Sequence, residues 1–369
     1  MKKRYKLVAT LVIVVVSSVI PGNMLKAGNP DRVGQAGATE LLINPWARSS
    51  GWAGSNVAGV RGLESIFSNV AGTAFTKKTE LIFARTQWLK GTDININGFG
   101  LTQHVGETGA IGLSVMSMRF GDIPITTTDV PEGGLGTFSP QFMNITVSYA
   151  KGFSDNIYGG LAVKVITEKI ANVGARGVAL DAGIQYVTGK REQLKFGIAL
   201  QNWGPKMKYT GDGLGFKTQV PASTTTATMT VEQRSEQFEL PSLLSIGAGY
   251  DFYVKKDSAS MKMHRITAMG TFTSCAFDKN QYKLGLEYAW KSMLMLRVGY
   301  TIEKGITKDL DYSSESSNTS LTTALKGPSA GFTFEIPFGK NKSTFGIDYS
   351  YRATNTFGGT HSIGARVNL

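Results

Sequence analysis

One short motif in this chain of 369 residues has the residue types of a hydrolase nucleophile. Gly327-Pro-Ser329-Ala-Gly331 matches the Gly-x-Ser-x-Gly elbow, which presents its serine between a strand and a helix. Here a polar loop precedes Ser329 and an expected strand follows it. Because a motif without its structural context is a weak signal, we interpret this one as a Gly/Ser turn that leads into a strand.

The remaining candidates for chemistry are also weak. The three histidines are far apart and match no compact metal-binding spacing: His104, His264 and His361. Gly211-Asp-Gly-Leu-Gly215 lacks the following lysine and the strand–helix frame of a phosphate-binding loop. We therefore expect no catalytic residue, no metal and no organic cofactor. A serine hydrolase that acts on envelope lipid stays open as a third, disfavoured hypothesis.

Charged residues in the second half of the chain alternate with apolar residues. Lys283 and Glu287 are interleaved with Leu284, Leu286 and Tyr288, for example. Side chains of a strand point alternately to opposite faces, so each such segment has one apolar and one polar face. The other charges on the polar phase are Lys164, Asp181, Lys195, Asp251, Arg297, Glu335, Asp348, Arg352 and Arg366. In a membrane barrel the apolar face contacts lipid and the polar face lines the lumen.

Fourteen such segments can be counted, most of them about ten residues or longer, as a tilted membrane-spanning strand requires. They lie near 79–89, 92–102, 109–120, 142–151, 156–168, 177–188, 193–203, 240–254, 264–275, 280–290, 293–303, 328–338, 342–352 and 359–369. The chain has no apolar run long enough for a spanning helix after its N-terminus. The fold class that we predict is all-β: a transmembrane antiparallel β-barrel of about 14 strands over residues 79–369.

The connections support an up-and-down barrel. The three longest, about 121–141, 204–239 and 304–327, all follow odd-numbered strands and so fall on one side. They are rich in Thr, Ser and Gly, which is typical of surface loops. With an even number of strands, both termini are expected on the opposite side. Gly159-Gly160 and Pro337 are candidate strand breaks.

Residues 1–27 have the pattern of a cleaved signal peptide, with a basic start, an apolar run from Leu7 to Ile20, and Ala27 before the expected cut. A retained anchor helix is disfavoured because the apolar run is too short. Without these residues the net charge falls from +12 to +7, and no basic run suggests nucleic acid as a partner. The single Cys275 excludes an intrachain disulfide. We expect an exported protein of the outer membrane.

Residues 28–78 lack the period of two and are rich in Gly, Ala, Ser and Asn. They form either a tail or a hatch that is folded into the lumen, and we favour the hatch because a 14-stranded barrel is too wide for side chains alone to fill. In a hatch, Arg48 needs carboxylate or carbonyl partners. Glu287, Glu335 and Asp348 are the lumenal candidates for such a lock. The alternative is an exposed Arg48 on a loose tail.

Several short segments resemble the PorV/PorQ family, a branch of the FadL-like outer-membrane barrels. Leu41-Leu-Ile-Asn-Pro45-Trp-Ala-Arg48-Ser-Ser-Gly51 is similar to the N-terminal motif of that family. Asn69-Val-Ala-Gly72 resembles its Asn-Pro-Ala-Gly hatch motif, with Val70 in place of proline. Thr86-Gln-Trp-Leu89 and Asn202-Trp-Gly-Pro-Lys-Met207 also resemble family segments, and the C-terminus resembles an assembly signal that ends in Leu369 rather than an aromatic. The hatch residues that the resemblance singles out are Pro45, Arg48, Gly51, Asn69 and Gly72.

The resemblance, which runs from about residue 35 to the end, implies a place in the type IX secretion system of Bacteroidetes. The implied partners are the large translocon barrel, cargo proteins with C-terminal signal domains and the lipids of the outer membrane, with cargo passed on to a surface-attachment complex. Whether the chain is of the PorV type, the PorQ type or a paralogue stays open. A second hypothesis is transport of hydrophobic small molecules, as in the wider FadL-like group, which needs an apolar pocket and an opening in the barrel wall.

Overall fold

A computed structural model describes residues 32, 34–221, 226–253, 264–303, 325–339, 343–354 and 357–369. The expected signal peptide, residues 1–27, lies outside the described residues. Fourteen long strands form the wall: β1 (Thr79–Gln87), β2 (Asn95–Val105), β3 (Gly109–Arg119), β6 (Gln141–Gly152), β7 (Ile157–Ile170), β8 (Val173–Thr188), β9 (Leu194–Trp203), β14 (Leu243–Tyr253), β15 (His264–Cys275), β16 (Gln281–Trp290), β17 (Leu294–Glu303), β18 (Leu325–Phe338), β19 (Ser343–Thr354) and β20 (Thr360–Asn368).

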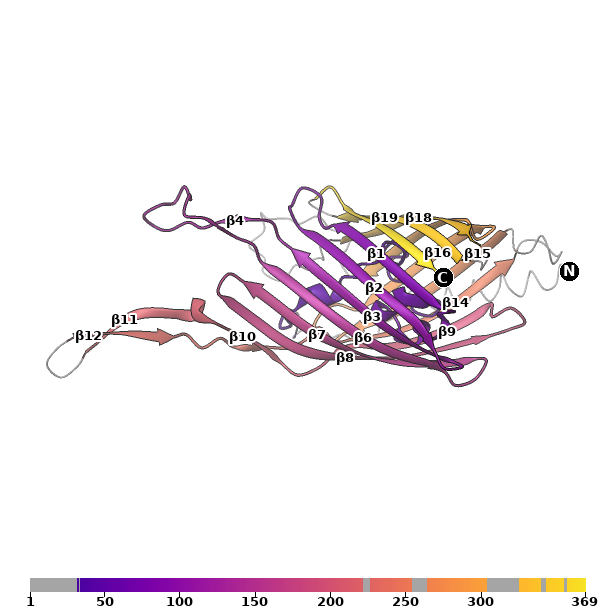
Figure 1. Ribbon diagram of the computed structural model, residues 1–369, viewed down its shortest axis with the longest axis horizontal. Coiled ribbons are helices and arrows are strands. Elements are labelled where there is room, and N and C mark those ends of the chain that lie inside the picture. The colour runs from indigo at the N-terminus through magenta and orange to yellow at the C-terminus, as the bar shows by residue number, and fades with distance from the viewer. Residues whose placement is uncertain are drawn as a thin grey trace.

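Each of these strands pairs antiparallel with the next one along the chain, and β1 pairs with β20 to close the barrel (Figure 1). Closure removes the unpaired strand edges that a membrane does not tolerate. The predicted class is therefore confirmed: the chain folds as a closed, antiparallel, 14-stranded barrel. The expected strand positions are correct to within a few residues, because the alternation of apolar and polar side chains marks each strand directly.

The two faces of the wall differ as predicted. Large apolar side chains are exposed on the outside, with Leu161 at 67% and Ile363 at 58%. Charged side chains point inward and are buried, such as Lys164 at 1% and Arg297 at 2% exposure. A charge on the lipid face at mid-depth would cost about 2–4 kcal/mol, so this segregation sets the register of every strand. None of the described helices is long and apolar enough to span a membrane.

Residues 34–78, which we call the hatch, pack inside the wall through four short helices. These are η2 (Thr39–Leu42), α2 (Ala47–Gly51), η3 (Gly62–Phe67) and η4 (Val70–Phe75). Helix α2 contacts β18 and β19, η3 contacts β1 and β2, and η4 contacts β6 and β7, so the hatch touches opposite sides of the wall. An apolar core joins the two, in which Trp46, Leu63 and Ile66 pack against Ile82 and Ile96.

The hatch begins at the end of the barrel that carries the long connections, which we call the loop side. There Gly34 donates a hydrogen bond to the carbonyl of Phe277, at 3.4 Å, and Gly37 donates to that of Glu239, at 3.0 Å. The other end, the terminal side, holds the start of β1 and the end of β20, where Leu369 N lies 2.9 Å from Thr79 O. The expectation that both termini lie opposite the long loops therefore holds for the barrel strands. The described start of the hatch lies on the loop side instead, because the hatch crosses the lumen before β1 begins.

Two hairpins extend the loop side. The longer is β11 (Gly215–Pro221) with β12 (Thr226–Glu232), and it projects well beyond the wall at the left of Figure 1. The shorter is β4 (Ile123–Pro124) with β5 (Thr137–Phe138). Two short strands, β10 (Met207–Thr210) and β13 (Gln237–Phe238), connect the long hairpin to β8. The loops at 121–141 and 204–239 thus contain strands that the sequence did not predict.

Glycines in the wall let the hatch approach the strand backbone. A Cβ atom at Gly183 of β8 would lie 2.1 Å from Oδ1 of Asn69, which is closer than any real contact. At Gly270 of β15 the nearest atom to a Cβ would be Leu284 Cδ2, at an ordinary 3.4 Å.

We predict that Gly183→Ala weakens the docking of the hatch, whereas the matched Gly270→Ala does not. The added methyl group at position 183 must displace Asn69, and such overpacking costs about 1–3 kcal/mol. Hydrogen exchange of residues 57–72 measures the effect, and heat-modified mobility on a gel checks that both barrels fold. Equal protection of the hatch in the two variants would show that the close contact between Gly183 and Asn69 does not hold the hatch in place.

Candidate functional site

The Asn69-Val-Ala-Gly72 motif attaches the hatch to β8. The Oδ1 atom of Asn69 accepts a hydrogen bond from Ala71 N at 3.2 Å and so caps η4. Its Nδ2 atom donates to two carbonyls at 3.1 Å, Val57 in the hatch and Ile184 in β8. A Cβ at Gly72 would lie 2.2 Å from the carbonyl oxygen of Val60, so only glycine fits there. The side chain of Asn69 therefore joins three backbone segments.

The first motif lies on the opposite part of the wall. Pro45 is buried against Gly98 of β2, where a Cβ would lie 3.1 Å from the proline ring. Gly51 is buried at β17 and β18, and its carbonyl accepts a hydrogen bond from Ser329 Oγ at 3.0 Å. The structure thus places the five expected hatch residues in two groups, Pro45, Arg48 and Gly51 near β2 and β17–β18, and Asn69 and Gly72 near β8.

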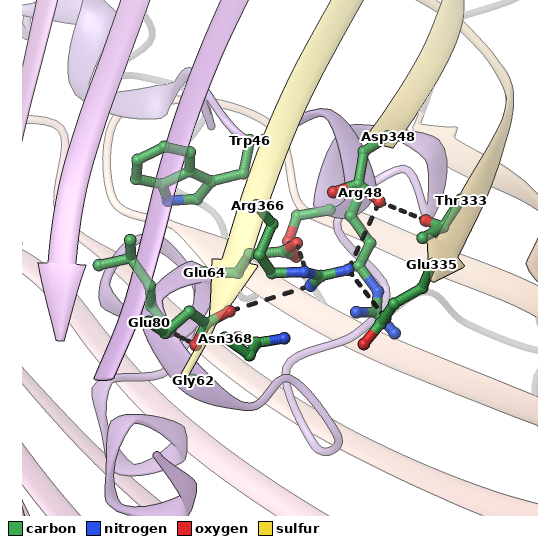
Figure 2. Close-up of polar contacts among 12 residues, drawn as sticks. Trp46, Arg48, Gly62, Glu64, Glu80, Thr333, Glu335, Asp348, Arg366 and Asn368 are labelled. Carbon is green, nitrogen blue, oxygen red and sulfur yellow. Dashed lines mark hydrogen bonds and ion pairs between the residues drawn. The ribbon is translucent and has the colours of Figure 1, made fainter. Parts of the chain in front are cut away.

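Arg366 of β20 is the centre of the largest charge cluster in the lumen (Figure 2). Its guanidinium forms ion pairs with Glu64 of the hatch at 3.5 Å, Glu80 of β1 at 3.9 Å, Glu335 of β18 at 3.5 Å and Asp348 of β19 at 3.7 Å. Glu80 also accepts a hydrogen bond from Leu63 N of the hatch at 2.8 Å. One side chain therefore connects the two strands that close the barrel with the hatch.

Arg48 lies beside this cluster but takes no part in its ion pairs (Figure 2). Of the carboxylates expected to hold it, Glu335 and Asp348 pair with Arg366, and Glu287 pairs with Arg297 at 3.0 Å and Arg265 at 2.9 Å. Among the described residues, Arg48 makes a hydrogen bond from Nη2 to Sδ of Met295, at 3.3 Å. Sulfur is a weak acceptor, so most of the donor capacity of this guanidinium is unused.

Sequence reasoning missed two acidic residues of the hatch, Glu40 and Glu64, which are 2% and 3% exposed. Glu64 accepts a hydrogen bond from Ser49 Oγ at 2.9 Å and pairs with Arg366. Glu40 lies against Glu168 of β7, which accepts a hydrogen bond from the hydroxyl of Tyr209. No signal in the sequence marks either residue, because the segment has no period that assigns its side chains to a face.

The carboxyl groups of Glu40 and Glu168 lie close together in an apolar environment. Glu40 is 2% exposed, and the surrounding side chains include Leu41, Ile166 and Met207. Burial, and then repulsion by Glu168, raises the pKa of Glu40 to about 8. Buried carboxyl groups so close together favour a state in which one of them keeps its proton.

The residues considered for hydrolysis are not assembled. Ser329 lies in β18 and uses its hydroxyl to bind the hatch carbonyl of Gly51. Each histidine ring forms a hydrogen bond with another group: His104 with the carbonyl of Thr76, His264 with the hydroxyl of Tyr288, and His361 with the hydroxyl of Tyr349. Among the described residues no group of His, Cys, Asp and Glu has the arrangement of a metal site.

No protein-family model matches the sequence, and no curated protein matches it. The fold is similar to solved structures described as the CymD monoaromatic hydrocarbon channel (12% identity, TM-score 0.51, 88% of this chain and 97% of that chain) and a deltaS2S3 mutant of the TodX monoaromatic hydrocarbon channel (11%, 0.51, 88% and 98%). A FadL homologue of Pseudomonas aeruginosa is also similar, at 11% identity and a TM-score of 0.48 over 87% of this chain and 96% of that chain. The chain has the same barrel fold as the CymD and TodX structures.

We predict that docking of residues 34–43 weakens as the pH rises. The carboxyl group of Glu40 takes up a proton on docking, so the stabilisation is complete below its ordinary pKa of 4.5 and is lost as the pH rises through about 8. Glu40→Gln, which is always neutral, removes this dependence and protects the segment better than the native residue at pH 9. The groups that face Glu40 are Glu168 and Tyr209.

Hydrogen exchange of the peptide that contains residues 34–43, followed from pH 5 to pH 9, measures the effect. Glu236→Gln, at an exposed position of the long connection, is the matched control and should leave the profile unchanged. A native profile that is flat over this range, or one that Glu40→Gln does not alter, would show that the pair does not control docking.

Proposed function

We propose that this chain is an outer-membrane channel for hydrophobic small molecules, which was the second hypothesis from the sequence. The observation that carries the proposal is an apolar hollow of about 510 Å³ on the outer face of the wall, over β6 to β9. Its sides are large and apolar: Tyr149, Phe153, Leu161, Ile184, Ile198 and Leu200. Small residues form its floor, among them Gly159, Gly160 and Gly183.

The hatch lies directly behind this floor. A Cβ at Gly160 would be 2.9 Å from the carbonyl oxygen of Val70, and one at Gly183 would contact Asn69. The lipid face and the Asn69-Val-Ala-Gly72 motif are thus separated only by the backbone of β7 and β8. A movement of the hatch at this point would change the wall beneath the hollow.

The ladder is irregular beside the hollow. The register of β8 against β9 shifts between Leu180 and Ala182, and such bulges are common next to functional sites. The expected breaks at Gly159-Gly160 and Pro337 are not present, since both lie in continuous pairing with their neighbours. Two glycines or a proline can remain in a ladder when neighbouring hydrogen bonds hold the backbone. At the shift in β8, Asp181 accepts a hydrogen bond from Asn202 N of β9 at 2.8 Å and pairs with Lys164 of β7.

The polar interior favours passage of an apolar solute through the barrel wall rather than along the barrel axis. The lumen is lined with buried ion pairs, such as Lys164 with Asp181 at 2.6 Å and Lys195 with Asp251 at 2.7 Å. An apolar solute would have to displace these groups without replacing their partners, which is unfavourable. The similar CymD and TodX structures are described as monoaromatic hydrocarbon channels, and this supports an apolar solute here.

We predict that Ala182→Phe reduces uptake of toluene about tenfold, equivalent to about 1.4 kcal/mol, in cells that rely on this protein for entry. Ala182 is opposite the outward-facing Leu161 and lines the hollow, so the added ring fills it without touching the hatch. Ala248→Phe makes the same change at an exposed position of β14 outside the hollow and should have no effect. Equal uptake by both variants would refute the role of the hollow.

A second candidate function, accessory binding in type IX secretion, is favoured by the projecting hairpin β11–β12. Phe216 is paired with Val231, and Thr218 with Met229, so the apolar side chains lie on one face. Phe216 and Met229 are 51% and 52% exposed. An isolated two-stranded hairpin is marginally stable in water, so a partner protein would be expected to cover this face. The sequence resemblance to the PorV/PorQ family supports this reading, and the partners would be the translocon barrel or cargo with C-terminal signal domains.

We predict for this second function that a tagged chain captures such partners from gently solubilised outer membranes, and that a variant with residues 215–232 replaced by a short turn does not. Replacing 124–137 in the shorter hairpin is the matched control. Mass spectrometry of the captured material identifies a very large barrel or exported proteins that share a C-terminal β-domain. A monomer that carries only lipid would favour the channel, and cargo that stays bound after trimming would exclude the hairpin.

A further inference from the structure

A second cavity lies between the hatch and the inner face of the wall on the terminal side, whereas the hollow lies on the outer face. Its volume is about 190 Å³, enough for several water molecules or one small polyatomic ion. Arg191 and Glu192, from the β8–β9 connection, lie at its border. Five of the side chains that line it are basic: Arg48 and Arg61 from the hatch, and Arg191, Lys195 and Arg265 from the wall.

Each acidic side chain of the lining already has a cationic partner. Glu192 pairs with Arg61 at 2.6 Å, and Asp251 pairs with Lys195 at 2.7 Å and accepts a hydrogen bond from Thr267 at 2.7 Å. Glu287 is shared between Arg265 and Arg297. Glu64 pairs with Arg366 at 3.5 Å and accepts a hydrogen bond from Ser49 Oγ at 2.9 Å.

Guanidinium donors remain unused at this cavity. Among the described residues, the guanidinium of Arg48 donates its one hydrogen bond to the sulfur of Met295. Arg265 donates from Nη2 to Glu287 at 2.9 Å, and its side chain is 30% exposed, so its guanidinium can also bind an anion that enters the cavity.

We infer that this cavity binds a small oxyanion, a phosphate or a carboxylate, between Arg48 of the hatch and Arg265 of β15. Guanidinium groups recognise both ions through paired, charge-assisted hydrogen bonds. The bound ion would connect the hatch to the wall, because Arg48 belongs to the hatch and Arg265 belongs to the wall. The inference goes beyond the proposed channel, since it concerns a polar cavity inside the wall rather than the apolar hollow on the outer face, and it does not depend on the transported solute.

The test is isothermal titration of the full chain in lipid-free detergent micelles with sodium phosphate and, separately, sodium acetate, each against sodium chloride at equal ionic strength. We expect saturable binding of at least one oxyanion and none of chloride. Arg48→Gln and Arg265→Gln should each weaken binding about tenfold or more, which corresponds to about 1.4 kcal/mol. The affinity of Arg48→Lys should lie between those of the native chain and Arg48→Gln, because an ammonium group keeps the positive charge but lacks the paired, coplanar donors of a guanidinium.

Arg119→Gln, at an exposed position at the end of β3, is the matched control and should bind like the native chain. Bound oxyanion should also slow hydrogen exchange of the hatch, a readout that is independent of transport. A short-chain phosphatidylglycerol that displaces phosphate would identify a lipid headgroup as the source, and failure to displace it would identify a free ion. Binding no stronger than that of chloride, or unchanged binding in Arg48→Gln, Arg48→Lys and Arg265→Gln, would overturn the inference.

Discussion

The structure depends on one constraint: charges on the strands cannot face lipid and must find partners inside the barrel. Period two places Lys164, Asp181, Arg297 and Arg366 on the inner face, and the closed wall buries all four. A buried charge without a partner is strongly destabilising, by about 3–5 kcal/mol when one member of a pair is removed. The folded barrel therefore requires the ion pairs of the lumen, and this requirement does not depend on what the protein transports or binds.

The hatch meets part of this requirement. Glu64 supplies one of the four carboxylates around Arg366, and the Asn69 side chain satisfies a carbonyl of β8. The apolar side of the hatch, with Trp46, Leu63 and Ile66, fills space that the wall residues leave open. The segment is thus part of the core of the protein, and its displacement would expose both charges and apolar surface.

The distribution of polar and apolar surfaces bears on function. The lumen is lined with ion pairs and holds the hatch, whereas the apolar hollow lies on the outer face of β6 to β9 over small residues. This arrangement is suited to an apolar solute that moves between the membrane and the hatch. The hairpin β11–β12 projects beyond the end of the wall (Figure 1), whereas the hollow lies over β6 to β9. Binding of a partner protein and movement of a solute would therefore use separate surfaces.

The sequence by itself determined the strands, their number and which face of each is polar, because a period of two is a local property of the chain. It also singled out Asn69 and Gly72, whose close contacts with the backbone require these residue types. Only the tertiary structure decided which charges meet. Arg366 rather than Arg48 pairs with Asp348 and Glu335, since partners across a lumen depend on barrel closure and on the path of the hatch. The same reason explains the Glu40–Glu168 contact and the loop-side start of the hatch, since each joins the hatch to wall residues more than 100 positions away in the sequence.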